Sequence, residues 1–223
     1  QGSVSLYNQG DGNLTIAQNL VATNGSVYLS AGASYNDDGR YDTPDRLTTT
    51  IVSTAGLQAG SNLNVYNNGD GAITVSGAVA AGSYTQLQTN HGNLTVTGPM
   101  TSAYSISLYS GGGALSVGQV SATNPGFGDV DLSADLGIQF EKVSAAGGSV
   151  TMTASAGSIR GTLDDTAADI SALRSVNLSA QESAGGFIGN ASFANPLDIV
   201  AGTAATDEVV LHAGGAIGAL GKP

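Results

Sequence analysis

The amino-acid sequence predicts an all-β protein that folds as a right-handed parallel β-helix, and three observations support this prediction. A unit of three short strands recurs along the chain, most clearly as LYNQGDGNLTIAQNLVA (6–22) and VYNNGDGAITVSGAVAA (65–81). Each strand alternates apolar and polar residues, which is typical of a strand with one buried face. The chain has no Trp and only 5% aromatic residues, so small aliphatic side chains must fill a narrow interior.

We call one turn of the predicted coil, with its three strands, a rung. The first strand of a rung contains a triplet of a β-branched residue, any residue and an aliphatic residue, and we use the second inward residue of this triplet as its marker. Successive markers are separated by 23, 36, 22, 21, 24, 20, 26 and 33 residues. The common spacing of 20–26 residues predicts about nine rungs, and the two long spacings indicate rungs that carry insertions. The nine markers are Leu6, Leu29, Val65, Leu87, Leu108, Leu132, Met152, Leu178 and Leu211.

Most markers are followed by a second predicted strand, and most of those by a third. The predicted second strands are 13–16, 72–75, 93–96, 114–117, 138–140 and 158–160, and the predicted third strands are 20–22, 78–80, 99–101, 119–121 and 142–144. Segment 164–176 is the best helical candidate, and we expect it to form no more than one helical turn.

Repetition of the whole unit favours a solenoid over a β-sandwich, which also needs short alternating strands. The repeated outward position, which we call the outward ladder, is polar in several units and is occupied by Gln139 and Arg160 later in the chain. The equivalent small polar residues are Thr15, Thr74, Thr95 and Ser116. In a solenoid, each strand pairs with its equivalent one rung above and below at about 4.8 Å, so nine rungs give a rod on the order of 40 Å long.

Composition excludes several classes of function. Seventeen acidic residues face six dispersed basic ones, giving a net charge of −11. Nucleic acid and anionic membranes are therefore not expected partners, because both need clustered Lys and Arg. The chain has no Cys and no apolar run long enough to insert into a membrane. It opens in mid-pattern without a signal peptide, so we expect a single β-helix segment, 1–223, of a longer protein.

The acidic insertion SYNDDGRYDTPDRLTTT (34–50) is the best candidate site, because loops on a rigid scaffold carry recognition. Its tyrosines and arginines could bind a sugar or a partner protein. Its carboxylates are oxygen ligands of the kind that Ca²⁺ binds. The alternative is a solvated spacer in which arginines pair with aspartates. The candidate ligand-binding residues are Tyr35, Arg40, Tyr41 and Arg46, and the candidate calcium ligands are Asp37, Asp38, Asp42 and Asp45.

Catalytic chemistry has weaker support. Asp129, Asp131 and Asp135 are the densest acidic group on predicted strands and turns, with Lys142 as the nearby cation. Paired carboxylates can act as acid and base on polysaccharides, but exposed turn aspartates are the simpler interpretation. His91 and His212 lack a third ligand for zinc. We therefore expect no enzyme activity.

Two aromatic residues fall in the last long rung. Phe187 and Phe193 are expected to plug the interior or to cover a wall of the coil rather than to form a ligand site.

The repeats resemble those of filamentous-haemagglutinin-type exoproteins of two-partner secretion systems. The units that carry this resemblance are GNLTIAQNLVATNGSVYLSAG (12–32), GSVTMTASAGSIRG (148–161) and the segment 188–221. The NPNG-like signature of the N-terminal secretion module is not present. The resemblance therefore implies a shaft segment rather than the secretion domain.

Several functional expectations follow from this resemblance. It implies export across the outer membrane by a transporter, and display on the bacterial surface or release. It also implies adhesion to a host-cell or matrix receptor, or to extracellular polysaccharide, in attachment, aggregation or biofilm formation. A polysaccharide-acting enzyme and a calcium-stabilised carbohydrate-binding module are the alternatives.

Overall fold

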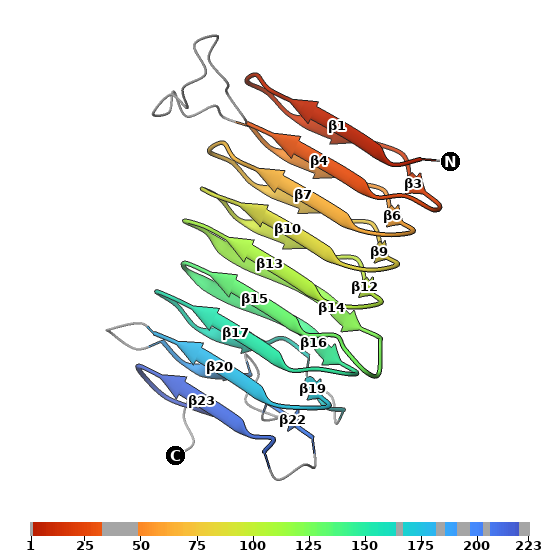
Figure 1. Ribbon diagram of the computed structural model, residues 1–223. Coiled ribbons are helices and arrows are strands. Elements are labelled where there is room, and N and C mark those ends of the chain that lie inside the picture. Colours follow the sequence, from red (N-terminus) through yellow and green to blue (C-terminus); the bar gives the residue numbers. More distant parts are fainter. Residues whose placement is uncertain are drawn as a thin grey trace.

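The computed structural model describes residues 2–32, 49–163, 167–181, 186–190, 197–202 and 206–218. These residues form β-strands and no helix, and the chain winds as a right-handed parallel β-solenoid with three walls (Figure 1). The described residues thus include no helix that could cross a membrane. The predicted fold class is confirmed. Segment 164–176, the helical candidate, contributes strand residues where it is described.

The first wall is a sheet of nine parallel strands, one from each rung. Its strands are β1 (Val4–Asn8), β4 (Val27–Ala31), β7 (Leu63–Asn67), β10 (Thr85–Thr89), β13 (Ile106–Ser110), β15 (Val130–Ala134), β17 (Val150–Ala154), β20 (Val176–Ala180) and β23 (Val209–Ala213).

A second sheet forms the other two walls, because β14 (Ala114–Ala122) and β16 (Gly137–Ala145) each continue from the second wall into the third. The second wall also contains β2 (Leu14–Ile16), β5 (Ile51–Ser53), β8 (Ile73–Val75), β11 (Leu94–Val96), β18 (Ile159–Gly161) and β21 (Ile188–Asn190). The third wall also contains β3 (Leu20–Ala22), β6 (Leu57–Ala59), β9 (Val79–Ala81), β12 (Met100–Ser102), β19 (Ile170–Ala172) and β22 (Ile199–Val200).

The predicted register is confirmed on the first wall. All nine markers pair in one column, from Leu6 opposite Leu29 to Leu178 opposite Leu211. The outward ladder also pairs as predicted on the second wall, where Thr74 lies opposite Thr95, and Gln139 lies opposite Arg160.

The number of rungs is slightly lower than predicted, at about seven. Seven rungs have strands of at least three residues on all three walls, whereas β22 in the next rung has two residues. The strand β23 begins a further rung, which the described residues continue only as a bridge between Ile188 and Ile217. The prediction counted one rung for each first-wall strand. The last strands extend the first wall although their rungs are incomplete on the other walls, so the prediction was slightly too high.

The sequence pattern also misplaces or misses some strands. Segments 78–80 and 99–101 begin one residue before β9 and β12. The pattern does not reveal β5 and β6, because the insertion separates them from the marker Leu29, and it also does not reveal β19, β21 and β22 in the last rungs. In the rung with the insertion, the extra residues lie between β4 and β5, and 33–48 are outside the described part of the chain.

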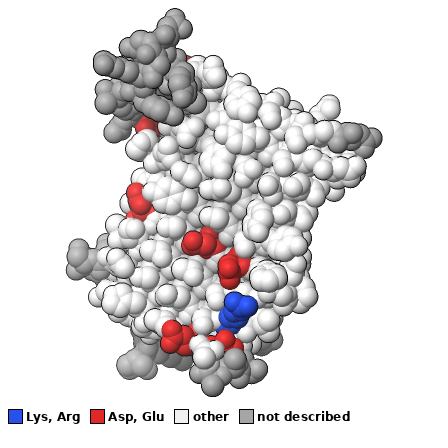
Figure 2. Space-filling view, in the orientation of Figure 1, with Lys and Arg blue, Asp and Glu red and all other residues white. Residues whose placement is uncertain are grey.

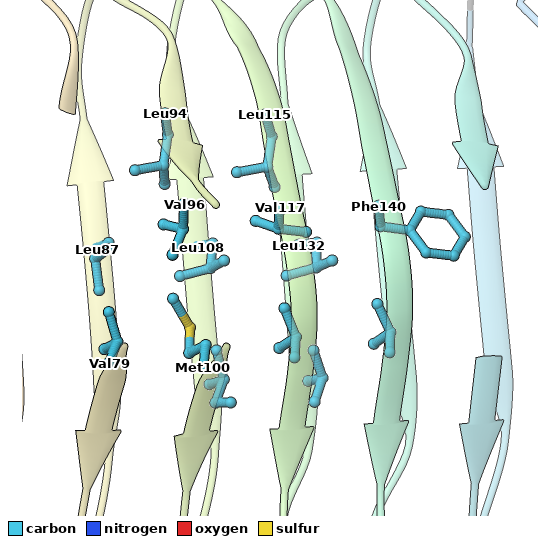
Figure 3. Close-up of a cluster of buried hydrophobic side chains, with 14 of the residues drawn as sticks. Val79, Leu87, Leu94, Val96, Met100, Leu108, Leu115, Val117, Leu132 and Phe140 are labelled. Atoms are coloured by element: carbon cyan, nitrogen blue, oxygen red, sulfur yellow. The ribbon is translucent and has the colours of Figure 1, made fainter. Parts of the chain in front are cut away.

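The core is a set of aliphatic columns that run along the solenoid. Figure 3 shows Leu87, Leu108 and Leu132 of the first wall with side chains in the space shared with those of the other walls. All three are at most 1% exposed. Phe140 is the largest fully buried side chain described, and it pairs with Gly161 of the next rung, where no side chain competes for the volume.

Polar side chains tie successive rungs together at the start of the strands. We use the term lead residue for the residue directly before the first inward residue of a strand. At several strands, the side-chain oxygen of a lead residue accepts a hydrogen bond from the backbone N–H of the lead residue one rung later. The lead carbonyl also accepts from the preceding rung, as Ser26 does from Val4 N (2.9 Å). Ser26 is therefore satisfied at both backbone groups.

This arrangement occurs on all three walls. Ser3 Oγ accepts from Ser26 N (3.0 Å) on the first wall, Asn93 Oδ1 from Ala114 N (2.9 Å) on the second, and Asn19 Oδ1 from Gly56 N (2.8 Å) on the third. Further examples are Asp129 with Ser149, Ser175 with Glu208, Ser158 with Phe187, and Asp169 with Asp198.

Truncation of a central column residue should weaken the fold strongly. Leu108→Ala removes a side chain that is 1% exposed, and we expect it to lower the free energy of unfolding by about 2–5 kcal/mol. Ser107→Ala, its outward neighbour, is the matched control and should change it by no more than about 0.5 kcal/mol. Urea unfolding measures both, and equal effects would contradict the assignment of inward and outward faces.

Gly157 should not tolerate a side chain. A Cβ at this position would lie 1.2 Å from the carbonyl oxygen of Leu136 on the preceding rung. The two rungs would have to move apart, so Gly157→Ala should cost about 1–3 kcal/mol or more. At Gly10 nothing lies within 4 Å of such a Cβ, so Gly10→Ala is the control. A Gly157→Ala protein with the melting temperature of Gly10→Ala would contradict the close approach.

Candidate functional site

The acidic insertion predicted as the main site lies almost wholly outside the described residues. Tyr35, Arg40, Tyr41, Arg46 and the four aspartates of the predicted calcium site, Asp37, Asp38, Asp42 and Asp45, all fall in 33–48. Their role as ligand or calcium residues stays a prediction. Within the described residues, no group of three or more His, Cys, Asp or Glu side chains could hold a metal ion.

The end of this insertion, at Thr49, lies within the described residues. A buried asparagine holds it in place. Asn67 is fully buried at the end of β7. Its Nδ2 donates to the carbonyls of Thr49 (2.8 Å) and Gly71 (3.0 Å), and its Oδ1 accepts from Thr49 Oγ1 (2.7 Å) and Gly69 N (3.2 Å). Because a buried amide is costly unless its hydrogen bonds are made, this network holds the returning chain at Thr49 in one position.

The predicted acidic group divides into a pair and a single residue. Asp129 and Asp131 lie two residues apart at the start of β15, and both are exposed. Asp135 follows the end of β15, where its Oδ2 accepts from Gly112 N (2.7 Å). Asp129 Oδ1 accepts from Ser149 N (2.8 Å), so it acts as a lead residue.

The electrostatics of the pair are unfavourable for two charges. Asp131 lies between Ser107 and Thr151 of the neighbouring rungs. Partial burial raises the pKa of the Asp131 carboxyl above its usual range, and the nearby charge of Asp129 raises it further. The pair is part of an open strand face, where Figure 2 shows few charged side chains.

A groove that the sequence did not reveal runs along the corner between the third and first walls. Its volume is about 410 Å³, and we call it the corner groove. The side chains that line it come from connections between third-wall and first-wall strands of successive rungs. They are Tyr84, Tyr104, Ser105, Phe127, Asp129 and Arg174.

Two aromatic rings of the corner groove stack on each other, and two of its three aromatic side chains are exposed. Tyr84 and Tyr104 stack with centroids 5.6 Å apart and ring planes at 26°. Tyr84 is 52% exposed, and Phe127, at 69%, is the most exposed large hydrophobic side chain of the described part of the chain. Sequence alone could have signalled this site only through aromatic residues at three successive corners of an aromatic-poor chain.

The loop that carries Phe127 is held by its own hydrogen bonds and by the next rung. Asn124 Oδ1 accepts from Gly126 N (2.9 Å) and Phe127 N (3.3 Å). A Cβ at Gly147 would lie 2.2 Å from the carbonyl oxygen of Asn124, so the loop lies directly on the backbone of the following rung. The loop is at the right-hand edge of Figure 1, between β14 and β15.

A second aromatic group lies on the outer face of the first wall near its beginning. Tyr28 has one ring neighbour on each side, Tyr7 at 5.4 Å and Tyr66 at 5.5 Å between centroids. The Tyr66 hydroxyl donates to Gln86 Oε1 (2.8 Å), and burial is the main cause that raises its pKa. These rings lie on successive strands of the first wall.

Phe187 covers the second wall, which is one of the two roles expected for it. It is 4% exposed, and the Arg160 guanidinium lies 4.7 Å from the centre of its ring. Phe193 lies outside the described residues.

Removal of the Asp129 charge should lower the pKa of the Asp131 carboxyl. Burial is the larger cause of the raised pKa, so Asp129→Asn should reverse only part of the shift. Carboxyl NMR titration measures this pKa. Asp135→Asn at the opposite end of β15 is the control, and an equal pKa of Asp131 in all proteins would contradict the coupling.

The same raised pKa has a consequence for stability. Because the folded state holds the Asp131 proton more tightly than the unfolded chain does, ionised Asp131 opposes folding at neutral pH. This unfavourable contribution declines as the pH falls through the folded-state pKa toward the unfolded value. Asp131→Asn should therefore raise the urea midpoint at pH 7, and the gain should shrink at acidic pH.

Comparison with known proteins adds no relative. No family model, no curated protein and no solved structure matches this chain. Fold and candidate site therefore come from the chain's own structure, and the resemblance to filamentous-haemagglutinin-type repeats comes from its sequence.

Proposed function

We propose that this chain is a non-enzymatic shaft segment of a large bacterial surface adhesin and that it mediates attachment, aggregation or biofilm formation. The parent protein would be exported across the outer membrane by its transporter and displayed at the cell surface or released. The observation that carries this proposal is the continuous register of the first wall, in which nine strands pair in one direction. Such a stack supplies length, which is what a shaft needs.

The energetics of the stack support a mechanical role. Backbone hydrogen bonds join each strand to the rung before and after it, so they run along the solenoid. Each rung contacts only its neighbours, and a solenoid of this kind lengthens by adding rungs without redesign of the rest. The aliphatic columns and lead residues repeat in the same way. Since the chain has no Cys, this cohesion needs no disulfide.

An enzyme that acts on polysaccharides is the competing proposal, and Asp131 is the residue that favours it. A general acid needs a raised pKa, and Asp131 has one. However, Asp131 does not line the corner groove, and the carboxylate of Asp129 is already hydrogen-bonded to Ser149 N. The shaft is therefore the better-supported function. A calcium-stabilised carbohydrate-binding module would depend on the 34–50 insertion.

Display of the segment on a bacterium that does not adhere should make that bacterium attach. The segment would be fused to an outer-membrane anchor, and attachment to glycan-coated and protein-coated surfaces and cell aggregation would be counted. We expect an increase over cells that carry the anchor alone. A deletion of 34–50 is the matched variant, and an unchanged effect of that variant would remove support from the insertion as the ligand site.

Two results would contradict the proposal. One is attachment and aggregation no greater than with the anchor alone. The other is shortened products after incubation of the purified chain with neutral or acidic polysaccharides, if Asp131→Asn abolishes their formation. That second result would make the chain an enzyme.

A further inference from the structure

The corner groove follows the direction of the solenoid rather than crossing it. Its side chains come from the connections before β10, β13, β15 and β20, with Gly147 before β17. At about 4.8 Å per rung, four steps from Tyr84 to Arg174 cover roughly 19 Å. The groove therefore suits a linear ligand with several repeating units better than a single small molecule.

The exposed rings need an explanation because folding does not account for them. Phe127 is 69% exposed and Tyr84 is 52% exposed, although aliphatic residues fill the core of this chain. Exposed aromatic groups that line one groove are typical of binding sites, where a ligand with an apolar face would cover them. Tyr84 and Tyr104 are already stacked, so a ligand need not order these two rings against each other.

The groove is formed before any ligand arrives. The Asn124 hydrogen bonds and the close contact of Gly147 with the Asn124 carbonyl fix the loop that carries Phe127. A preformed site loses little conformational freedom on binding, which favours affinity.

The polar groups of the groove are available to a ligand. Asp129 uses Oδ1 for Ser149 N, and its other carboxylate oxygen has no hydrogen bond to the described residues. Within the same residues, the Arg174 guanidinium makes no hydrogen bond or ion pair, and only the backbone N–H and carbonyl of Arg174 are bonded. A free carboxylate oxygen accepts from hydroxyl groups, and a guanidinium donates to them.

Charge determines which class of ligand fits. The groove contains one carboxylate and one guanidinium, so it has no net charge of its own. An acidic sugar would be repelled by Asp129 and the adjacent Asp131, and by the net charge of −11 on the chain. A cationic sugar would be repelled by the guanidinium of Arg174. A neutral sugar ring offers an apolar C–H face for the aromatic rings and hydroxyl groups for both charged side chains.

We propose that the corner groove binds an extended neutral glycan, which stacks on Tyr84, Tyr104 and Phe127 and hydrogen-bonds to Asp129 and Arg174. This inference builds on the adhesive role proposed above and gives it a surface and a ligand class. The glycan lies along the solenoid, with successive sugars over successive rungs.

Calorimetry on the full chain tests this inference. The neutral probes are cellohexaose, β-1,4-mannohexaose and laminarihexaose, and the charged probes are hexagalacturonate and chitosan hexamer. We expect at least one neutral hexasaccharide to bind, with hexagalacturonate and chitosan hexamer binding more weakly. Loss of a stacked ring should weaken binding about tenfold or more in Phe127→Ala and in Tyr84→Ala.

Tyr109→Ala is the matched control, because Tyr109 is an exposed tyrosine of the same wall that does not line the groove. It should bind like the wild-type chain. Circular dichroism and thermal unfolding would show that each variant folds. The inference is overturned if no neutral probe binds, if a charged probe binds most tightly, or if Phe127→Ala and Tyr84→Ala both bind like Tyr109→Ala.

The display assay separates the failure of this inference from the failure of the proposed function. If displayed wild-type and Phe127→Ala segments attach equally well, adhesion stands and the groove is not its ligand site. If a neutral probe binds the purified chain in a Phe127-dependent way but displayed cells do not attach, the groove stands and the adhesive role falls.

Discussion

The fold depends on pairing between each residue and its counterpart one rung away. This single constraint sets the parallel direction of the strands and the columns of the interior. It also provides hydrogen-bond partners for backbone N–H and carbonyl groups at the corners. Because a slip by one residue would turn every inward side chain outward, the register must be defended at each strand. At several strands, lead residues do this locally. A serine, asparagine or aspartate oxygen recognises the backbone N–H of its counterpart in the next rung, so the start of one strand positions the next.

Repetition also determines where function can appear on such a molecule. A column of serines and threonines gives the same surface at every rung, whereas a change of residue type within a column makes one place different from the rest. Five of the nine first-wall lead residues are serines, and Tyr84 and Asp129 are two of the four changes of this kind. The serines are Ser3, Ser26, Ser105, Ser149 and Ser175, and the other two changes are Asn62 and Glu208. The corner groove lies where these departures coincide with the longer loop that carries Phe127.

The fold could be read from the sequence because its main contacts recur at a nearly constant spacing. The apolar triplets located all nine first-wall strands, and the outward ladder from Thr74 to Arg160 has the predicted register. The same pattern missed β5 and β6 after the insertion and β19, β21 and β22 in the last rungs. It placed some short strands one residue early, since a lead residue and a strand residue are both polar or small. The corner groove could not be predicted, because its members are separated by about one rung each and meet only through the loop geometry at Asn124 and Gly147. The residues of the acidic insertion remain predictions.

The pairing of Phe140 with Gly161 shows that volume in the interior is shared between neighbouring rungs rather than assigned to each position. The other inward residues of this column near it, Val96 and Val117, are of intermediate size and can repeat without conflict. A copy of the rung that contains Phe140 would set phenylalanine upon phenylalanine, where the present neighbour Gly161 has no side chain. Duplication of a valine-bearing rung would instead repeat an existing contact, that of Val96 with Val117, so those rungs are the better units for lengthening the solenoid.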